Sequence, residues 1–387
     1  MMLTESQREI RQLAEEYAER EVRPYADEWD RTATFPMKAI TAMAEAGLLG
    51  MTAEEEWGGV GADSVSVALA VEAISNADAT VALVLSMANS LSVMTLMKYG
   101  TASQREQWLP AIVSGEAIAS FAISEAHAGS NPVKMKTRAV KDGDRYIVSG
   151  EKSFISLGSV SRLCFLFVKT DPDAGPKGIS CFLVPTDTPG FKVLRSEDKL
   201  GIRASDTCQL AFEDMELRAD QMIGLPGQGY QIALHGLGAS RIGVAAQAVG
   251  VANAAYKAAA AYAREREAFD RRLVDHQGIG FRLANMAMEI AAARHMTLHA
   301  ARLKDSGESY STASAMAKTY ASEMCERVCS SAIQVFGANG YMSENPVGKY
   351  YRDARVFQIY EGTTEIQRMI IARAIADDKL DREMNPL

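Results

Sequence analysis

The spacing of apolar residues changes twice along the chain and divides it into a helical, a strand-rich and a second helical block. Up to about residue 118, apolar residues such as Ile10, Leu13 and Tyr17 follow helical spacing, and Thr4 followed by Gln7 is a typical helix start. The longest apolar stretch, 81–97, is interrupted by serines and an asparagine. Because a bilayer span needs about 20 predominantly apolar residues, we expect a buried helix there and no membrane span.

From Phe121 onward the pattern changes to short runs of β-branched and aromatic residues, separated by turn-forming residues. No helical segment alternates with these runs, so the pattern favours an antiparallel β domain over a parallel α/β sheet. The runs are 146–148, 164–168, 181–184 and 208–212.

From Gly229 the chain is alanine-rich and helical again, and Phe281, Met288 and Leu298 follow helical spacing. We find no internal repeat and no low-complexity linker, so the domains are expected to dock tightly. The predicted fold class is α+β multidomain, with an N-terminal helical domain at 1–118, a middle antiparallel β domain at 119–228 and a C-terminal helical domain at 229–387.

Composition excludes several classes of protein. The 387-residue chain has a formal net charge of -8, which disfavours nucleic-acid binding. The five cysteines are scattered and odd in number, so neither a disulfide framework nor a zinc site is expected. The N-terminal residues lack a basic segment followed by an apolar one. We therefore expect a cytoplasmic protein with reduced thiols.

The common nucleotide and metal motifs are also missing. The sequence has no P-loop and no G-x-S-x-G elbow. Gly236-Leu237-Gly238 meets Arg241 where a dinucleotide fingerprint needs its last glycine, so no Rossmann unit is expected. His295 and His299 share a helical face without a third ligand nearby, so no metal site is predicted.

Two segments could carry chemistry. In 121–131, an apolar strand leads into a polar loop whose Ser124, Ser130 and backbone amides could bind a planar polar ring or phosphates. An ordinary strand-to-loop transition is the alternative, and His127 is unusual among the small residues of this loop. Further on, Glu361 lies between an aromatic-rich run and a helix that begins at Thr363 or Thr364.

A loop glutamate held by rigid neighbours suits a general base if burial raises its pKa. The alternative role for Glu361 is to stabilise the positive N-terminus of the helix that follows it. The residues alone leave both roles open.

Taken together and in order, these segments resemble the acyl-CoA dehydrogenase family over nearly the whole chain. Short-chain (butyryl-CoA type) members are the most similar. The segments that carry the resemblance are 121–131, 199–205, 212–214, 240–243, 334–341 and 360–363, with Arg373.

The resemblance implies a C-terminal four-helix bundle, a homotetramer and FAD between the β domain and the C-terminal helices. It also implies α,β-dehydrogenation of an acyl-CoA thioester to the trans-2-enoyl-CoA. Glu361 would take the α-proton, the β-hydrogen would leave as hydride to the flavin, and an electron-transferring flavoprotein would accept the electrons. Hydrogen bonds to the thioester carbonyl would stabilise the developing enolate.

The resemblance also assigns the remaining site residues, one position at a time. Those implied to contact FAD are Phe121, Ala122, Ile123, Ser124, Gly129, Ser130, Phe154, Ile155, Ser156, Arg266, Phe269, Gln277, Gln334, Val335, Gly337, Ala338, Thr363, Thr364 and Glu365. Of these, Arg266 and Gln277 would reach FAD across a subunit contact. Those implied to contact the acyl-CoA are Ser130, Gly238, Ser240, Arg241, Tyr360 and Gly362.

The departures from the family pattern gather around the flavin and the pocket mouth and leave Glu361 unchanged. They are Ala126, His127, Asn131, Phe154, Ser156 and Leu157. Phe154 replaces a tryptophan, so the aromatic cover remains but the indole N–H donor is lost. Three alternatives stay open: an enoyl-CoA reductase running in the reverse direction, a flavin monooxygenase or oxidase on the same fold, and a flavin-free binding homologue.

Overall fold

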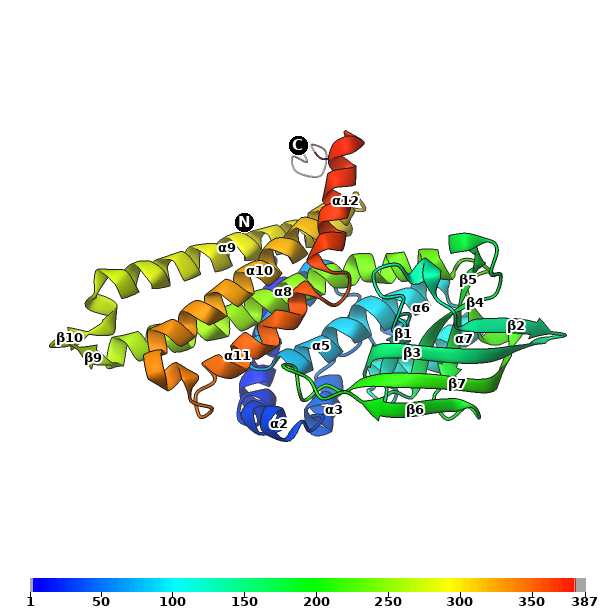
Figure 1. Ribbon diagram of the computed structural model, residues 1–387, viewed down its shortest axis with the longest axis horizontal. Coiled ribbons are helices and arrows are strands. Elements are labelled where there is room, and N and C mark those ends of the chain that lie inside the picture. The colour runs from blue at the N-terminus through cyan, green and yellow to red at the C-terminus, as the bar shows by residue number, and fades with distance from the viewer. Residues whose placement is uncertain (1–2, 379, 381–387) are drawn as a thin grey trace.

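The computed structural model describes residues 3–378 and 380. Helices form the first and last parts of the chain, the strands come between them in sequence, and the sheet lies at one end of the molecule (Figure 1). The hydroxyl of Thr4 accepts from the backbone N–H of Gln7 at 3.2 Å, which confirms the predicted helix start. The N-terminal region comprises α1 (Glu5–Tyr17), η1 (Ala18–Val22), α2 (Ala26–Thr32), α3 (Met37–Glu45), η2 (Glu55–Trp57), α4 (Ser64–Ser75), α5 (Ala79–Met87), η3 (Ala88–Val93), α6 (Met94–Tyr99) and α7 (Ala102–Val113).

The apolar stretch of the sequence forms α5, the π-helical turn η3 and α6, which follow one another without a break. Asp78 begins this segment, since its Oδ1 accepts from the backbone N–H groups of Thr80 at 2.8 Å and Val81 at 3.1 Å. By length and composition alone Ala79–Tyr99 could cross a membrane, but 83% of its most apolar window is buried inside the protein. It is a core helix, as expected.

The middle region is a sheet with the strand order β6-β7-β3-β2-β4-β5-β8, and β1 also pairs with β4. Most pairs are antiparallel, but β1 and β2 run parallel to β4, so the sheet is mixed where the sequence predicted a purely antiparallel one. The strands are β1 (Ala119–Ala122), β2 (Arg138–Asp142), β3 (Arg145–Ser156), β4 (Leu163–Lys169), β5 (Ile179–Pro185), β6 (Phe191–Ser196), β7 (Thr207–Arg218) and β8 (Met222–Ile223).

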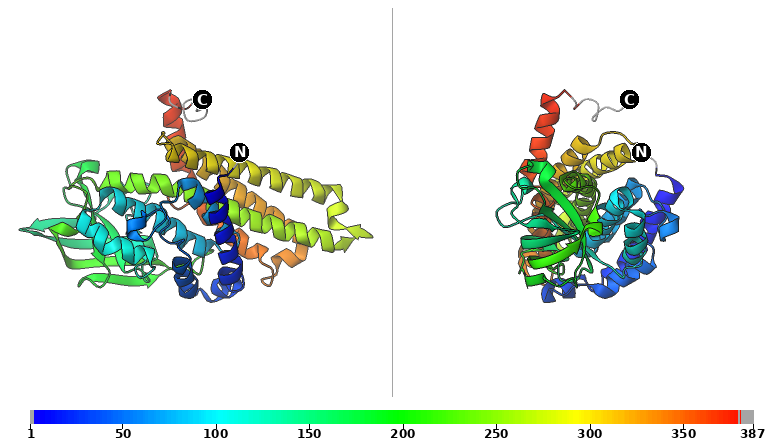
Figure 2. Two further views of the ribbon diagram at one scale, coloured as in Figure 1. Left: turned by 180° about the vertical axis from the view of Figure 1, so that it is seen from behind. Right: turned by 90° about the vertical axis from the view of Figure 1, so that its right-hand side faces the viewer.

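The C-terminal region is built around the 37-residue helix α8 (Gly229–Glu265), which packs against α9, α10 and α4. Viewed from behind, the N-terminal helices lie across the long C-terminal ones (Figure 2). After α8 come the hairpin strands β9 (Glu267–Ala268) and β10 (Arg271–Arg272), α9 (Gln277–Asp305), α10 (Ser311–Phe336), η8 (Gly337–Tyr341), α11 (Val347–Ala354), η9 (Arg355–Gln358) and α12 (Thr364–Ala376).

The apolar residues that predicted α9 do not all lie on its buried face. Phe281 is 65% exposed and Met288 is 63% exposed, whereas Leu283, Met286 and Ile290 are buried. The helix therefore presents apolar side chains on two faces, and only one face is covered by its own chain.

All five cysteines are free and buried, which confirms that the chain has no disulfide framework. Cys325 and Cys329 share one face of α10, with their sulfur atoms 4.0 Å apart. Burial raises the pKa of the Cys325 thiol, so the thiol stays protonated and behaves as a small apolar group.

Candidate active site

Glu361 lies on a short loop between η9 and α12, in a backbone conformation that favours glycine. Its φ is 53° and that of the following residue, Gly362, is 92°. A Cβ added to Gly362 would lie 2.7 Å from the Nε2 atom of Gln367, so a larger residue would have to displace that side chain. A glutamate held at positive φ is strained, and such strain persists only where the surroundings fix the loop.

Two fully buried side chains supply that support. Lys318, on α10, donates from Nζ to the carbonyl oxygen of Gly362 at 2.6 Å. Gln367, on α12, donates to the same oxygen at 2.9 Å and to the carbonyl oxygen of Glu361 at 3.3 Å. Because both donors are held inside helices, they fix the backbone of the Glu361 loop against α10 and α12.

The carboxylate of Glu361 keeps a free acceptor. Its Oε2 atom is buried and has no hydrogen-bond partner, and the nearby Ser240 hydroxyl donates to the carbonyl oxygen of Leu237 at 3.2 Å. Burial raises the pKa of Glu361, although the Ser240 hydroxyl and the positive charges of Lys318 and Arg241 act to lower it. A carboxylate of raised pKa with one buried oxygen that has no hydrogen-bond partner is suited to proton abstraction.

The alternative role, stabilising the start of α12, belongs to other residues. Thr363 is the N-cap of α12, and its side chain accepts from the backbone N–H of Ile366 at 3.5 Å. The acidic residue in the first turn is the exposed Glu365, and a hydrogen bond to its own backbone N–H together with the Thr363 side chain lowers its pKa. Glu361 is therefore free for another role.

Two buried cations lie close to Glu361. Burial lowers the pKa of Lys318 to about 8, although Glu361 acts to raise it. Arg241 is 6% exposed and its Nε atom is buried without a hydrogen-bond partner. Burial lowers the pKa of Arg241, and Glu361 and Tyr310 act to raise it. A buried polar atom without a partner is costly, so this site suits a polar ligand.

The structure brings most of the predicted substrate residues together. Ser240 and Arg241 lie beside Glu361, which is flanked by Tyr360 and Gly362. Gly238 lies one helical turn before Arg241 on α8, and a Cβ there would come within 3.5 Å of the Tyr310 hydroxyl. Ser130 is different, because it lies exposed in the loop that follows β1.

The loop that follows β1 is held in place by a buried ion pair between Glu125 and Lys152. Glu125 accepts from the ammonium of Lys152 at 3.0 Å and from the backbone N–H groups of Lys136 at 2.6 Å and Thr137 at 2.9 Å. Lys152 also donates to the carbonyl oxygen of Ile123 at 3.0 Å. Glu125 and Lys152 are both buried, so they fix the backbone while Gly129 and Ser130 remain exposed to a ligand.

Phe154 is the most exposed residue of the predicted flavin set on this sheet. It is 66% exposed, while its neighbours Ser153 and Ile155 are buried. The pairing of β3 with β7 shifts its register between Lys152 and Ile155, and Phe154 has a φ of 61°. The backbone N–H of Ser153 donates to the carbonyl oxygen of Ser124 at 2.9 Å, so this shift lies beside the loop. An outward aromatic ring next to a loop with the exposed residues Gly129 and Ser130 fits a planar ring system.

Thr363, Thr364 and Glu365 follow Glu361 at the start of α12, but two further groups of predicted FAD residues lie elsewhere. Arg266, Phe269 and Gln277 surround the β9–β10 hairpin, at the end of the long helices opposite the sheet (Figure 1). Gln334, Val335, Gly337 and Ala338 lie at the C-terminal end of α10, which belongs to the same end of the molecule. There the ring of Tyr262 stacks on Phe336 at 4.3 Å and its hydroxyl accepts from Asn339 at 2.8 Å. One chain therefore does not bring all predicted cofactor residues together.

His127 is not part of the Glu361 loop. Its Nε2 atom lies 3.6 Å from the buried Glu125 carboxylate, and its side chain is 45% exposed. Among the residues that the structure describes, no group of three histidine, cysteine, aspartate or glutamate side chains could hold a metal ion.

Sequence reasoning missed Lys318 and Gln247. Lys318 is the only charged residue of the segment 311–322 at the start of α10, and Gln247 is the only amide in the apolar run 242–251 of α8. A polar residue that interrupts the buried face of a helix needs a partner there. That pattern was the available signal, although it does not identify the partner.

The chain belongs to the acyl-CoA dehydrogenase family, a class of oxidoreductase. The models of the family's N-terminal, middle and C-terminal domains match residues 4–116, 120–215 and 227–376. Members of this family are flavoproteins that act on acyl-CoA, and the chain is accordingly an acyl-CoA dehydrogenase.

Short-chain members are among its most similar relatives. The chain is 42% identical over 370 residues to the mitochondrial short-chain specific acyl-CoA dehydrogenase of Mus musculus, covering 96% of this chain and 90% of that protein. The butyryl-CoA dehydrogenase structure from Megasphaera elsdenii is 37% identical with a TM-score of 0.95, covering 97% and 99% of the two chains. A glutaryl-CoA dehydrogenase from Mycobacterium smegmatis in complex with FADH2 is 29% identical with a TM-score of 0.91, covering 97% and 95%.

Proposed function

We propose that this chain is an FAD-dependent short-chain acyl-CoA dehydrogenase in which Glu361 removes the α-proton of the thioester. The observation that carries the proposal is the buried Oε2 atom of Glu361, which has no hydrogen-bond partner on a strained but well-supported loop. The α-proton of a thioester is only weakly acidic. A base of raised pKa in a desolvated site is better matched to it than an exposed carboxylate is.

The chain's own residues bind, orient and desolvate the substrate. The backbone N–H of Glu361 and the polar groups on α8 would hold the acyl-CoA so that its α-carbon faces Oε2. The positive charges of Lys318 and Arg241 favour the ionised form of the base, because they oppose the effect of burial on its pKa. FAD, when bound, supplies the hydride acceptor for the β-hydrogen.

The proposed FAD site uses two copies of the chain. The loop 121–131 and Phe154–Ser156 would hold the flavin ring, with Thr363, Thr364 and Glu365 beside them. The residues at the β9–β10 hairpin and the end of α10 would reach the FAD of a second copy. Support comes from the separation of these two groups and from Phe269, which is 91% exposed at the hairpin. A homotetramer that passes electrons to an electron-transferring flavoprotein completes the proposal.

The test is an anaerobic titration of the purified protein with butyryl-CoA, isobutyryl-CoA and octanoyl-CoA while its visible spectrum is recorded. A yellow protein whose flavin band bleaches most readily with butyryl-CoA would support the proposal. Bleaching by another acyl-CoA would keep the reaction and change the substrate. Rapid reoxidation by air would favour an oxidase. A colourless protein that cannot take up FAD would overturn the proposal.

A further inference from the structure

The side chain of Gln247 connects the loop of Glu361 to another domain. Gln247 lies in the middle of α8 and is fully buried. Its Oε1 atom accepts from the hydroxyl of Tyr360 at 2.5 Å, and its Nε2 atom donates to the carbonyl oxygen of Ala79 at 2.6 Å. Tyr360 directly precedes Glu361, and Ala79 is the first residue of α5. The two polar atoms of the Gln247 side chain therefore link the Glu361 loop to the start of α5.

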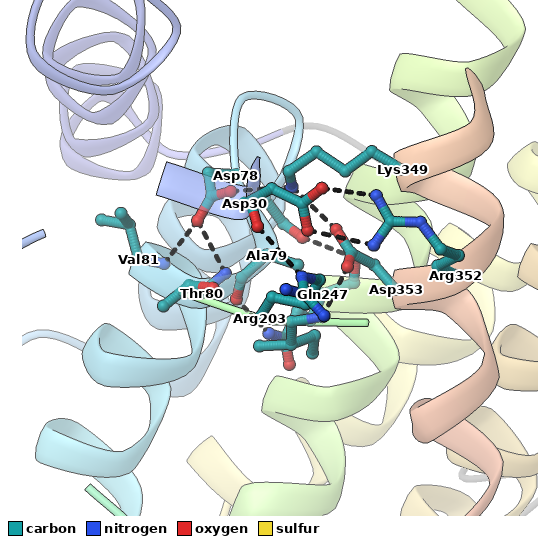
Figure 3. Close-up of polar contacts among 12 residues, drawn as sticks. Asp30, Asp78, Ala79, Thr80, Val81, Arg203, Gln247, Lys349, Arg352 and Asp353 are labelled. Atoms are coloured by element: carbon teal, nitrogen blue, oxygen red, sulfur yellow. Dashed lines mark hydrogen bonds and ion pairs between the residues drawn. The ribbon is translucent and has the colours of Figure 1, made fainter. Parts of the chain in front are cut away.

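The α5 end of this connection is fixed. Asp78 precedes Ala79 and caps α5 with one carboxylate oxygen, while the other oxygen lies 2.8 Å from the ammonium of Lys349 (Figure 3). Asp78 and Lys349 are both buried. The carbonyl group of Ala79 is thus held between a helix cap and a buried ion pair.

The same ammonium also holds the segment that leads to Glu361. Lys349 lies 2.7 Å from Asp353 on α11, and Asp353 accepts from the backbone N–H of Ile202 at 2.5 Å. Burial alone would lower the pKa of Lys349, but the carboxylates of Asp353 and Asp78 raise it above its ordinary value. From α11 the chain passes through η9 to Tyr360. The segments at both ends of the Gln247 connection are therefore held by the ammonium of Lys349, through Asp78 and Asp353.

This closed path has a consequence for the orientation of the base. A catalytic group works only when neighbouring side chains hold it within about 0.5 Å of its productive position. Lys318 and Gln367 hold the backbone of the loop on its C-terminal side, at Glu361 and Gly362. The Tyr360–Gln247 hydrogen bond holds the other side, and in the described residues it joins this loop to α8 and α5.

We propose that Gln247 is a positioning residue for Glu361, acting through the Tyr360 hydroxyl and anchored by the carbonyl group of Ala79. The inference rests on the proposed role of Glu361 as the base. It assigns Gln247 no contact with substrate or cofactor. Its effect is on where the Glu361 carboxylate lies when the α-proton is removed.

The test compares three single variants of the FAD-loaded enzyme. Gln247→Leu removes both hydrogen bonds at similar volume, and Tyr360→Phe removes only the hydroxyl. Ser75→Ala is the matched control, since the Ser75 hydroxyl is buried and donates to the backbone carbonyl oxygen of Gln247 at 2.8 Å. That change loosens the same turn of α8 but leaves the Gln247 side chain in place.

Two measurements separate proton abstraction from the full reaction. The first is the rate constant of flavin reduction at saturating butyryl-CoA. The second is the pH dependence of the long-wavelength charge-transfer absorption band that forms between bound, deprotonated 3-thiabutyryl-CoA and the oxidised flavin. This analogue can lose its α-proton to the base, but it has sulfur in place of the β-carbon and so has no β-hydrogen to transfer.

For Gln247→Leu we expect reduction to slow about tenfold, the pH midpoint of the band to move, and the analogue's dissociation constant to stay within about threefold. Tyr360→Phe should do the same, and the double variant should be no slower than the slower single one, because both changes break one connection. Ser75→Ala should lower the melting temperature and leave both readouts unchanged.

Equal effects of Gln247→Leu and Ser75→Ala on both readouts would overturn the inference, as would multiplying effects in the double variant. Should Gln247→Leu not fold, unchanged kinetics in Tyr360→Phe would overturn it as well. Failure of the proposed function is distinguishable from these results. In that case the wild-type protein would neither bleach with any acyl-CoA nor form the band with the analogue, and the inference would fall with it.

Discussion

The ammonium of Lys318 lies 2.6 Å from the carbonyl oxygen of Gly362, the residue that follows Glu361. A positive charge is thereby placed beside the carboxylate without a hydrogen bond to its Oε2 atom. The charge lowers the pKa of Glu361 while burial raises it. Since the two influences oppose each other, the positive charge favours the ionised base, and the lone pair of Oε2 stays available for a proton.

Replacing Glu361 by glutamine should abolish reduction of the flavin by acyl-CoA. Glutamine has nearly the same shape but cannot accept the proton, and a lost general base costs about 10²–10⁴-fold or more in rate. The measurement is the stopped-flow bleaching of the FAD-loaded variant. Because the change removes no proposed cofactor contact, FAD content should stay at the wild-type level. A variant that still bleaches at the wild-type rate would assign the base to another group.

Replacing Lys318 by methionine should move the acid limb of the reduction rate to higher pH. The base must be ionised to work, so the rate rises with pH through the pKa of Glu361. Removing a nearby positive charge raises that pKa. Each unit by which it rises reduces the ionised fraction about tenfold on the acid side. The measurement is the pH profile of the reduction rate constant.

Lys318→Gln is the matched control for this experiment. Glutamine removes the charge but can still donate to the Gly362 carbonyl oxygen, so the acid limb should shift in both variants. Only methionine also removes the hydrogen bond, and only that variant should slow at high pH. An unchanged profile in both would show that the charge does not act on Glu361.

Replacing Phe154 by alanine should weaken FAD binding about tenfold, since an aromatic contact of this kind contributes roughly 0.5–1.5 kcal/mol beyond the area it buries. Phe154→Trp keeps an aromatic cover and should bind FAD at least as well. The measurement is the dissociation constant of FAD from the apoprotein, by fluorescence titration. The folded apoprotein should lose little stability, because the ring is 66% exposed. Equal affinities in all three proteins would remove Phe154 from the flavin site.

Replacing Lys349 by methionine should strongly destabilise the fold. The change leaves the carboxylates of Asp78 and Asp353 buried side by side without their cation, and breaking a buried ion pair in this way costs about 3–5 kcal/mol. The control is Arg145→Gln, because Arg145 forms an exposed ion pair with Glu216, with side chains 59% and 58% exposed. Exposed pairs contribute about 0–1 kcal/mol. Denaturant unfolding of both variants measures the difference, and similar losses would contradict the prediction.

Local signals were enough to predict the order of the elements. Helical spacing, strand runs and the Thr4 cap depend on residues close in sequence, and these predictions are confirmed. The parallel pairing of β1 and β2 with β4 was not predicted, because it joins segments distant in sequence. The exposed apolar face of α9 was also not predicted, since spacing does not tell which face the same chain covers.

The candidate site shows the same division. Motif resemblance pointed to Glu361 and its neighbours, and the structure shows the burial that distinguishes Glu361 from the exposed Glu365. Lys318 and Gln247 act through contacts with residues 44 and 113 positions away. These contacts form only when distant segments pack together, so no local sequence pattern predicts them. The outward position of Phe154 likewise depends on a register shift against β7.

The exposed Phe269 hairpin lies at the end of the molecule opposite the sheet (Figure 1). On the proposed shared site, each chain supplies its base and flavin loop to one catalytic centre and its hairpin to another. A chain defective at Glu361 and a chain defective at Arg266 would then restore one intact centre when they assemble together. Genetic complementation between two inactive alleles follows directly from the distance between these two parts of the fold.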